Sequence, residues 1–257
     1  MINLKNIIFD HFPFTHGLAK NVIEENFYNA LVEEFPKPDV LITTLDKKSN
    51  NKFNKFSLSS NLQKNDFFLI INKKKKLKEF VNYLLSFEFK EYLIQTLSNY
   101  RIEFGVVLQK PNVKYYIKKI IKDLLPNILI KPNQEFELHV EFSSIPFKGG
   151  MIKPHTDSQH KFASIVIPIV EKNLEDDFNG GTNFLKPKNK HNGFNFINNT
   201  LEFDDTEIIK TISFERNQFL IFFKTYNSLH SVGPMKGNNE NNYRNSITLT
   251  LEKKIKV

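Results

Sequence analysis

Residues 136–142 read Phe-Glu-Leu-His-Val-Glu-Phe, and residues 162–170 read Phe-Ala-Ser-Ile-Val-Ile-Pro-Ile-Val. The first run alternates apolar and polar side chains, which is the period of a half-buried strand, and the second is rich in β-branched residues, as a fully buried strand is. Three further runs, at 208–213, 218–223 and 246–251, have strand character, and turns that contain glycine separate them. Many short strands without intervening helices predict an antiparallel sandwich or jelly roll.

The N-terminal part of the chain has the spacing of amphipathic helices instead. Apolar residues recur every three or four positions from Gly17 to Phe35 and again from Leu77 to Leu93. Residues 112–125 predict a third helix, which a proline ends. Residues 37–66 are polar and rich in Asn, Lys and Ser, and they predict a long loop.

The predicted organisation is α+β, with an α-rich N-terminal extension over residues 1–130 packed on a β-rich core over residues 131–257. The chain contains no cysteine, which excludes disulfides, thiolate zinc sites, Fe–S clusters and cysteine nucleophiles. A transition metal would have to be bound by imidazole and carboxylate, and seven histidines are available. No apolar run reaches the roughly 20 residues that span a bilayer, and the first residues lack a signal-peptide pattern, so we expect a soluble cytoplasmic protein.

The formal net charge of +8 has two interpretations. A basic chain is typical of proteins that bind nucleic acid. However, arginine occurs only at Arg101, Arg216 and Arg244, so 33 of the 36 basic residues are lysine. Nucleic-acid readers rely on the planar fork of arginine. We therefore favour compositional drift as the cause of the charge, and rank a nucleic-acid partner below a small-molecule or peptidyl substrate.

A candidate metal site comes from three residues of the β-rich part. His155 and Asp157 stand two apart in Lys-Pro-His-Thr-Asp, and residues two apart in a strand point to the same face. His230, near the end of the strand-rich stretch, is the candidate for a third ligand. Two imidazoles and one carboxylate on one face of an octahedron leave three positions open, which suits the non-haem Fe(II) oxygenases.

A candidate anion-binding residue follows the third ligand. Arg244 begins the strand-like run that ends at Leu251. A guanidinium binds a carboxylate through two parallel hydrogen bonds, which a lysine cannot do. Ser246 lies on the same strand face, and its hydroxyl could donate a further hydrogen bond. We expect this pair to bind the distal carboxylate of a 2-oxo diacid whose other end chelates the metal.

In this order, His155-Thr156-Asp157, His230 and Arg244-Asn245-Ser246 resemble the motif of the 2-oxoglutarate/Fe(II)-dependent dioxygenase superfamily, in the pattern of its prolyl-4-hydroxylase-like members. Residues 179–184 resemble the Gly-Gly turn that often lies between the two metal-ligand segments. The resemblance covers about residues 136–251. It implies a double-stranded β-helix (jelly-roll, cupin-like) core that binds Fe(II). It also implies 2-oxoglutarate as co-substrate, O₂ as oxidant, and hydroxylation with release of succinate and CO₂.

The chain departs from this pattern at one place, and two alternative functions stay open. Many such members carry a tyrosine on the strand before the first metal ligands, and here His139 and Phe142 are the alternatives for the residue that faces the pocket. Asp157 stands where halogenating relatives have a small residue, which disfavours halogenation. The alternatives are a nucleic-acid demethylase of the same superfamily, prompted by the charge, and a non-catalytic jelly-roll module that binds a ligand or a partner protein.

The other polar residues near these motifs are predicted to lie on the surface, in turns or in structural positions. Lys161 could face an anionic substrate, but we predict a surface lysine. Arg216, between two strand-like runs, is predicted to be an exposed turn residue. His160 is off the strand parity of the metal motif and is expected in a loop or behind the ligands, and His16 is expected to be structural.

Overall fold

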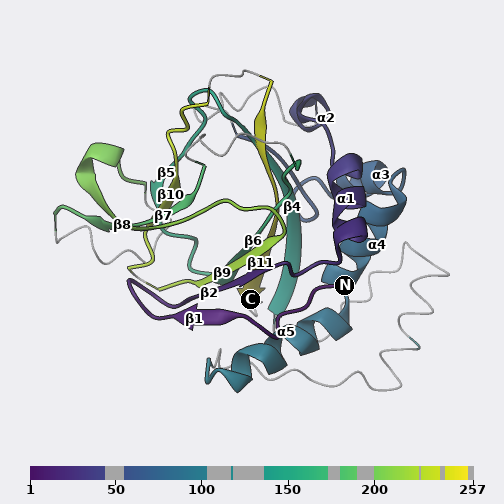
Figure 1. The fold of residues 1–257 in the computed structure, drawn as a ribbon, viewed down its shortest axis with the longest axis horizontal. Helices are drawn as coiled ribbons and strands as arrows, with labels where there is room; N and C mark the ends of the chain where they lie inside the picture. The colour runs from purple at the N-terminus through teal and green to yellow at the C-terminus, as the bar shows by residue number, and fades with distance from the viewer. Residues whose placement is uncertain are drawn as a thin grey trace.

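The computed structural model describes residues 1–43, 55–102, 117, 136–172, 180–189, 200–225, 227–237 and 241–253. Two antiparallel sheets form its centre, and helices gather on one side of them (Figure 1). The strands are β1 (Ile8–Asp10), β2 (His16–Lys20), β3 (Phe56–Ser59), β4 (Phe136–Pro146), β5 (Ile152–His155), β6 (Lys161–Pro168), β7 (Thr182–Pro187), β8 (Thr206–Ile212), β9 (Gln218–Phe223), β10 (His230–Val232) and β11 (Tyr243–Lys253). The helices are α1 (Glu25–Glu34), α2 (Pro38–Thr43), α3 (Lys64–Ile71), α4 (Lys75–Leu84) and α5 (Phe87–Asn99), with a 3-10 turn at Phe203–Asp205.

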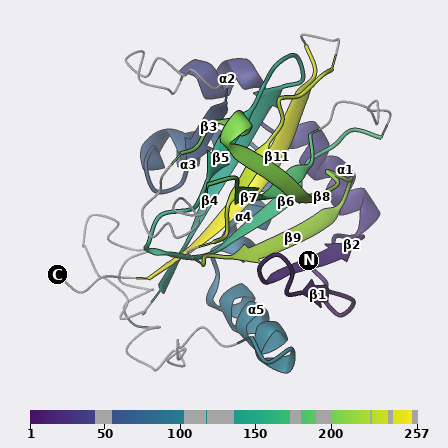
Figure 2. The same cartoon turned by 90° about the vertical axis from the view of Figure 1, so that its left-hand side faces the viewer.

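The order of the strands is that of a jelly roll. The major sheet has the order β1-β2-β9-β6-β11-β4-β3, and the minor sheet has the order β5-β10-β7-β8. From β4 to β11 the chain passes repeatedly between the two sheets, because β4, β6, β9 and β11 belong to the major sheet and the other four strands to the minor one. Figure 2 shows β4, β11 and β6 side by side. The antiparallel strands predicted for the C-terminal half are confirmed, although β7 and β10 were not predicted as strands.

The helices cover one face of the major sheet, and the alternation along its strands decides which residues they bury (Figure 1). Leu138, Val140 and Phe142 of β4 belong to the same core cluster as residues of α1, α3, α4 and α5. Phe142 stacks on Phe67 of α3 at 4.8 Å between ring centres. The intervening residues of β4 point the other way, toward the minor sheet, since successive side chains of a strand alternate. None of the helices in the described part of the chain has the length and apolar character that a membrane span requires.

The N-terminal part contains three strands that local spacing did not predict. Gly17 to Lys20, predicted as helix, belongs to β2, and the loop predicted over 37–66 includes α2, β3 and the start of α3. These short strands lie at the edges of the major sheet: β2 pairs with β9 and β3 with β4, both far away in sequence, and β1 pairs with β2. The single helix predicted around Leu77 to Leu93 is two helices, because the Ser86 hydroxyl accepts from the Phe89 amide and begins α5. The helix predicted over 112–125 lies outside the described residues, apart from residue 117.

Buried polar contacts fix α1 to the end of β6. The Tyr28 hydroxyl donates to the Pro168 carbonyl and accepts from the Val170 amide, both at 2.9 Å. Arg216 donates to the Val170 carbonyl at 2.7 Å, pairs with Glu25 at 2.8 Å and lies over the Tyr28 ring at 4.3 Å. Arg216 lies in a turn, as predicted, but it is not exposed, because the tertiary fold brings α1 against this turn.

Replacing Tyr28 by phenylalanine should lower the free energy of unfolding by about 1–3 kcal/mol, because two buried backbone groups lose their partner while the ring stays. Urea denaturation followed by circular dichroism measures the change. Tyr100→Phe is the matched control, since Tyr100 is 41% exposed. Equal stability of the two variants would contradict the importance of this contact.

Candidate functional site

A polar pocket of about 170 Å³ lies between the two sheets. Its β11 wall is formed by alternate residues, Arg244, Ser246, Thr248 and Thr250, whereas the intervening Ile247 and Leu249 pack toward the helices. The predicted common face of Arg244 and Ser246 is therefore present. A larger cleft of about 850 Å³ lies outside the sandwich between α1, α2 and β11, and none of the candidate metal ligands lines it.

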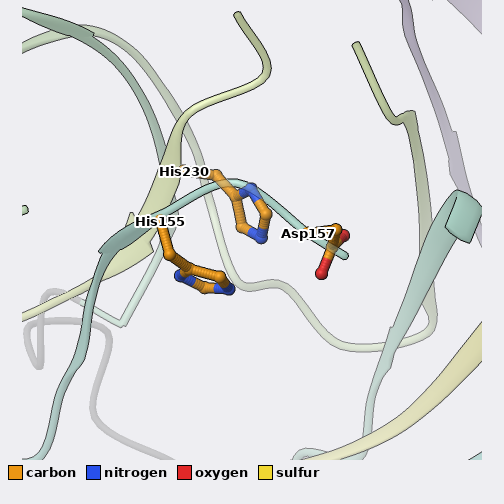
Figure 3. Close-up of side chains that lie close together, drawn as sticks. All are labelled: His155, Asp157 and His230. Atoms are coloured by element: carbon orange, nitrogen blue, oxygen red, sulfur yellow. The ribbon is translucent and has the colours of Figure 1, made fainter. Parts of the chain in front are cut away.

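His155, Asp157 and His230 line this pocket, and Figure 3 shows that their side chains lie close together. One donor atom from each lies within 4.8 Å of the others, and the two imidazole centres are 4.4 Å apart. His155 ends β5 and is the direct partner of His230 at the start of β10, so pairing between these strands sets the imidazoles side by side. Asp157 lies beyond the end of β5, not within a strand as predicted. The turn of the chain after β5 carries its carboxylate toward the imidazoles instead.

Backbone carbonyls orient both imidazoles. Nδ1 of His155 lies 2.8 Å from the Lys153 oxygen, and Nδ1 of His230 lies 3.0 Å from the Ser228 oxygen. A carbonyl oxygen can only accept, so the proton sits on Nδ1 and the lone pair of Nε2 is available to a metal. Burial lowers the pKa of both imidazoles. The neighbouring His230 lowers the pKa of His155 further, to about 3. Both imidazoles are therefore neutral at pH 7, the form that binds metals.

The third donor is held as a carboxylate. Ser164 Oγ donates to one Asp157 oxygen at 2.7 Å, and Lys161 Nζ donates to the other at 3.0 Å. Burial raises the pKa of Asp157, but the two imidazoles, the Lys161 ammonium and the Ser164 hydroxyl together hold it well below its ordinary value. Two neutral nitrogens and one anionic oxygen form a donor set that suits a divalent transition metal. Lys161 lines the pocket, so the prediction of a surface lysine is wrong.

Removing the Ser164 hydroxyl should weaken metal binding by about tenfold, because partners that orient a metal ligand typically contribute 10- to 100-fold in affinity. Competition for Co(II) against a chelator would measure the affinity of Ser164→Ala. Ser143→Ala serves as control, since Ser143 lines the same pocket from β4. If both variants bound the metal as tightly as the parent protein, the hydroxyl would have no role in holding Asp157.

Arg244 presents a buried guanidinium to the same pocket. It is 3% exposed, its Nε donates to the Gly180 carbonyl at 2.7 Å, and it lies over the Phe214 ring at 3.9 Å. Burial lowers the pKa of Arg244 to about 9, and among the described residues no carboxylate contributes to the pKa of this guanidinium. A buried charge without a counter-charge is unfavourable, so this arrangement favours an anion bound in the pocket.

The Gly180-Gly181 turn lies next to this guanidinium. A Cβ on Gly181 would lie 2.7 Å from Thr211 Cγ2 and 2.8 Å from the Ile212 carbonyl. Glycine therefore lets the backbone approach β8 closely, and the preceding carbonyl of Gly180 meets Arg244. Residue 179, where the predicted motif begins, lies outside the described residues.

The pocket-facing residues of β4 are Glu141 and Ser143, and neither expected candidate lines the pocket. Phe142 points into the helical side of the core, and His139 lies 3.6 Å from Glu252 near the far end of the strand. Glu141 forms an ion pair with Lys55 at 2.5 Å. The alternation of residues 136–142 already places 139 and 141 on one face. The sequence alone did not indicate where along the strand the pocket lies.

Comparisons with known proteins find distant structural matches and no match to a family model or a curated protein. A prolyl-4-hydroxylase of Pseudomonas putida is 11% identical, with a TM-score of 0.46 over 93% of both chains. A prolyl hydroxylase from Trichoplax adhaerens, solved with a peptide fragment of the hypoxia inducible factor oxygen degradation domain, is 12% identical, with a TM-score of 0.45 over 93% of this chain and 83% of that one. The Fe(II)/α-ketoglutarate-dependent dioxygenase TqaL is 11% identical, with a TM-score of 0.42 over 91% of this chain and 77% of that one.

The solved structures to which the chain is similar are thus hydroxylases and dioxygenases, the class that its sequence motifs resemble. With TM-scores below 0.5, this likeness carries no functional argument, and the function is inferred from the geometry of the site.

Proposed function

We propose that the chain is an Fe(II)- and 2-oxoglutarate-dependent dioxygenase that hydroxylates a small-molecule or peptidyl substrate and releases succinate and CO₂. One observation carries the proposal: a pocket that brings two imidazoles and a carboxylate within 4.8 Å of one another also holds a buried guanidinium. Two nitrogens and one oxygen leave coordination positions for a bidentate 2-oxo acid and for O₂. The guanidinium matches the second carboxylate of that acid.

Each group in the pocket has a role in this proposal. His155, Asp157 and His230 would hold the iron, and Arg244 with Ser246 would bind the distal carboxylate of 2-oxoglutarate. When bound, the iron supplies the activation of O₂, which no side chain can provide.

The remaining residues prepare the site. Backbone carbonyls hold Nδ1 of both imidazoles, so that Nε2 would be available to the metal, and Ser164 holds the carboxylate in place. Val166, Phe222 and Val232 line the pocket with apolar surface, which limits water around the reacting groups.

The experiment that tests the proposal measures binding before turnover. Full-length protein, purified without oxygen, is titrated with Fe(II) and then with 2-oxoglutarate, and succinate is measured after O₂ is admitted. We expect a visible charge-transfer band only when both are present, and succinate formation that depends on both. Turnover is expected to be slow without the substrate. Failure to bind Fe(II) and 2-oxoglutarate together would therefore overturn the proposal, whereas slow turnover would not.

The two alternative functions gain no specific support from the pocket. A demethylase that acts on nucleic acid needs aromatic side chains that stack on a flipped base, and a basic groove. Among the described residues that line the pocket, Phe222 is the sole Phe, Tyr or Trp side chain, and it lies against His230 at 4.6 Å. A binding module without catalysis would not require three oriented metal donors.

A further inference from the structure

The pocket holds one more positive charge than the proposed iron and co-substrate use, and this inference rests on the proposed function. Its described lining has three cations, Lys55, Lys161 and Arg244, and two anions, Glu141 and Asp157. Lys55 and Glu141 balance each other in an ion pair. Fe(II) and Arg244 would be balanced by Asp157 and the two carboxylates of 2-oxoglutarate. In this count, the positive charge of the Lys161 ammonium is the one that is not balanced.

Lys161 lies at the opposite end of the pocket from Arg244. It is the first residue of β6 and pairs with Glu252, eight residues after Arg244 on β11. At about 3.4 Å per residue, the two backbone positions are roughly 27 Å apart. The distal carboxylate of a diacid bound by Arg244 would therefore lie out of reach of Lys161. Glu252 is not among the residues that line the pocket, and its carboxylate faces His139 at 3.6 Å.

A second lysine adds to the positive charge at this end. The backbone amide of Lys224 donates to the Phe162 carbonyl. This hydrogen bond sets Lys224 close to Lys161, the residue before Phe162 in β6. Lys224 is half-buried, and burial lowers its pKa; the Asp157 carboxylate opposes this shift, and the charge of Lys161 adds to it. The side chain of Lys161 is 26% exposed, so a substrate can reach it.

We propose that Lys161 is a specificity-determining residue that binds a carboxylate of the substrate beside the metal, so that the substrate is an organic anion. Asp157 would give much of its charge to the metal, which weakens its attraction for the ammonium 3.0 Å away. Ser164 still holds the other oxygen of Asp157. The ammonium has three donors on a flexible stem, so it can keep one contact and offer others to a ligand.

The test uses matched pairs of a carboxylate and its neutral amide: benzoate with benzamide, hexanoate with hexanamide, and N-acetylglycine with its amide. Each is added to full-length protein loaded with Mn(II) and 2-oxoglutarate, and binding is read from the paramagnetic relaxation of the probe's protons. We expect at least one carboxylate to bind about tenfold or more tightly than its amide, as a charge-assisted hydrogen bond implies. Lys161→Met should remove that preference, and Lys161→Arg should retain most of it. Lys172→Met, an exposed lysine on the outer cleft, should change nothing.

The outcomes separate this inference from the proposed function. If the carboxylates bound Lys161→Met as tightly as they bind the parent protein, they would be ligating the metal directly. That result would overturn the inference about Lys161. Weaker 2-oxoglutarate binding in Lys161→Met would show that the lysine binds the co-substrate. That result would also overturn the inference about Lys161. A protein that binds Mn(II) and 2-oxoglutarate but never prefers a carboxylate contradicts this inference alone. A protein that binds neither contradicts the proposed function and this inference with it.

Discussion

Replacing Arg244 by methionine is expected to weaken 2-oxoglutarate binding by about a hundredfold or more, while Fe(II) affinity stays within about threefold. The guanidinium of Arg244 is a buried cation that lies away from the metal donors. Its Nε already donates to the Gly180 carbonyl. A variant without it leaves the distal carboxylate of the co-substrate buried and unpaired. Calorimetric titration of 2-oxoglutarate into Mn(II)-loaded protein would measure the loss.

Two further variants sharpen this result. Arg244→Lys keeps the charge but loses the paired hydrogen bonds of the guanidinium, so its affinity should lie between those of the parent and the methionine variant. Arg101→Met is the matched control, because Arg101 is exposed and does not line the pocket. If Arg244→Met lost iron as well as 2-oxoglutarate, the proposed division between metal donors and co-substrate residue would be wrong.

Replacing His155, Asp157 or His230 by alanine is expected to weaken metal binding by more than about a hundredfold and to abolish turnover at the same time. Each residue would supply one of three donor atoms, so its loss should exceed the 10- to 100-fold effect typical of outer-shell partners. Chelator competition with Co(II) measures affinity, and succinate release measures turnover.

The control for this series is His160→Ala. His160 lies in the turn between Asp157 and β6, close in sequence to the donors but outside the converging group. We expect the parent's metal affinity in this variant. Should His160→Ala lose the metal while His230→Ala keeps it, the three proposed ligands would be the wrong set.

The sequence by itself determined the residue types of the site and the strand character of the core. Alternation over 136–142 and the β-branched run over 162–170 are local patterns, and β4 and β6 are where they predict strands. Donor chemistry is also a property of single residues. Two histidines, one aspartate and one of only three arginines could therefore be selected, although their roles as ligands stay predictions.

Only the tertiary structure decided how these residues meet. Pairing of β5 with β10 sets His155 beside His230, and the turn after β5, not strand parity, brings in Asp157. The same folding turned Lys161 into the pocket. The physical reason is that sheet hydrogen bonds join segments far apart in the chain, and periodicity within one segment contains no information about its partner.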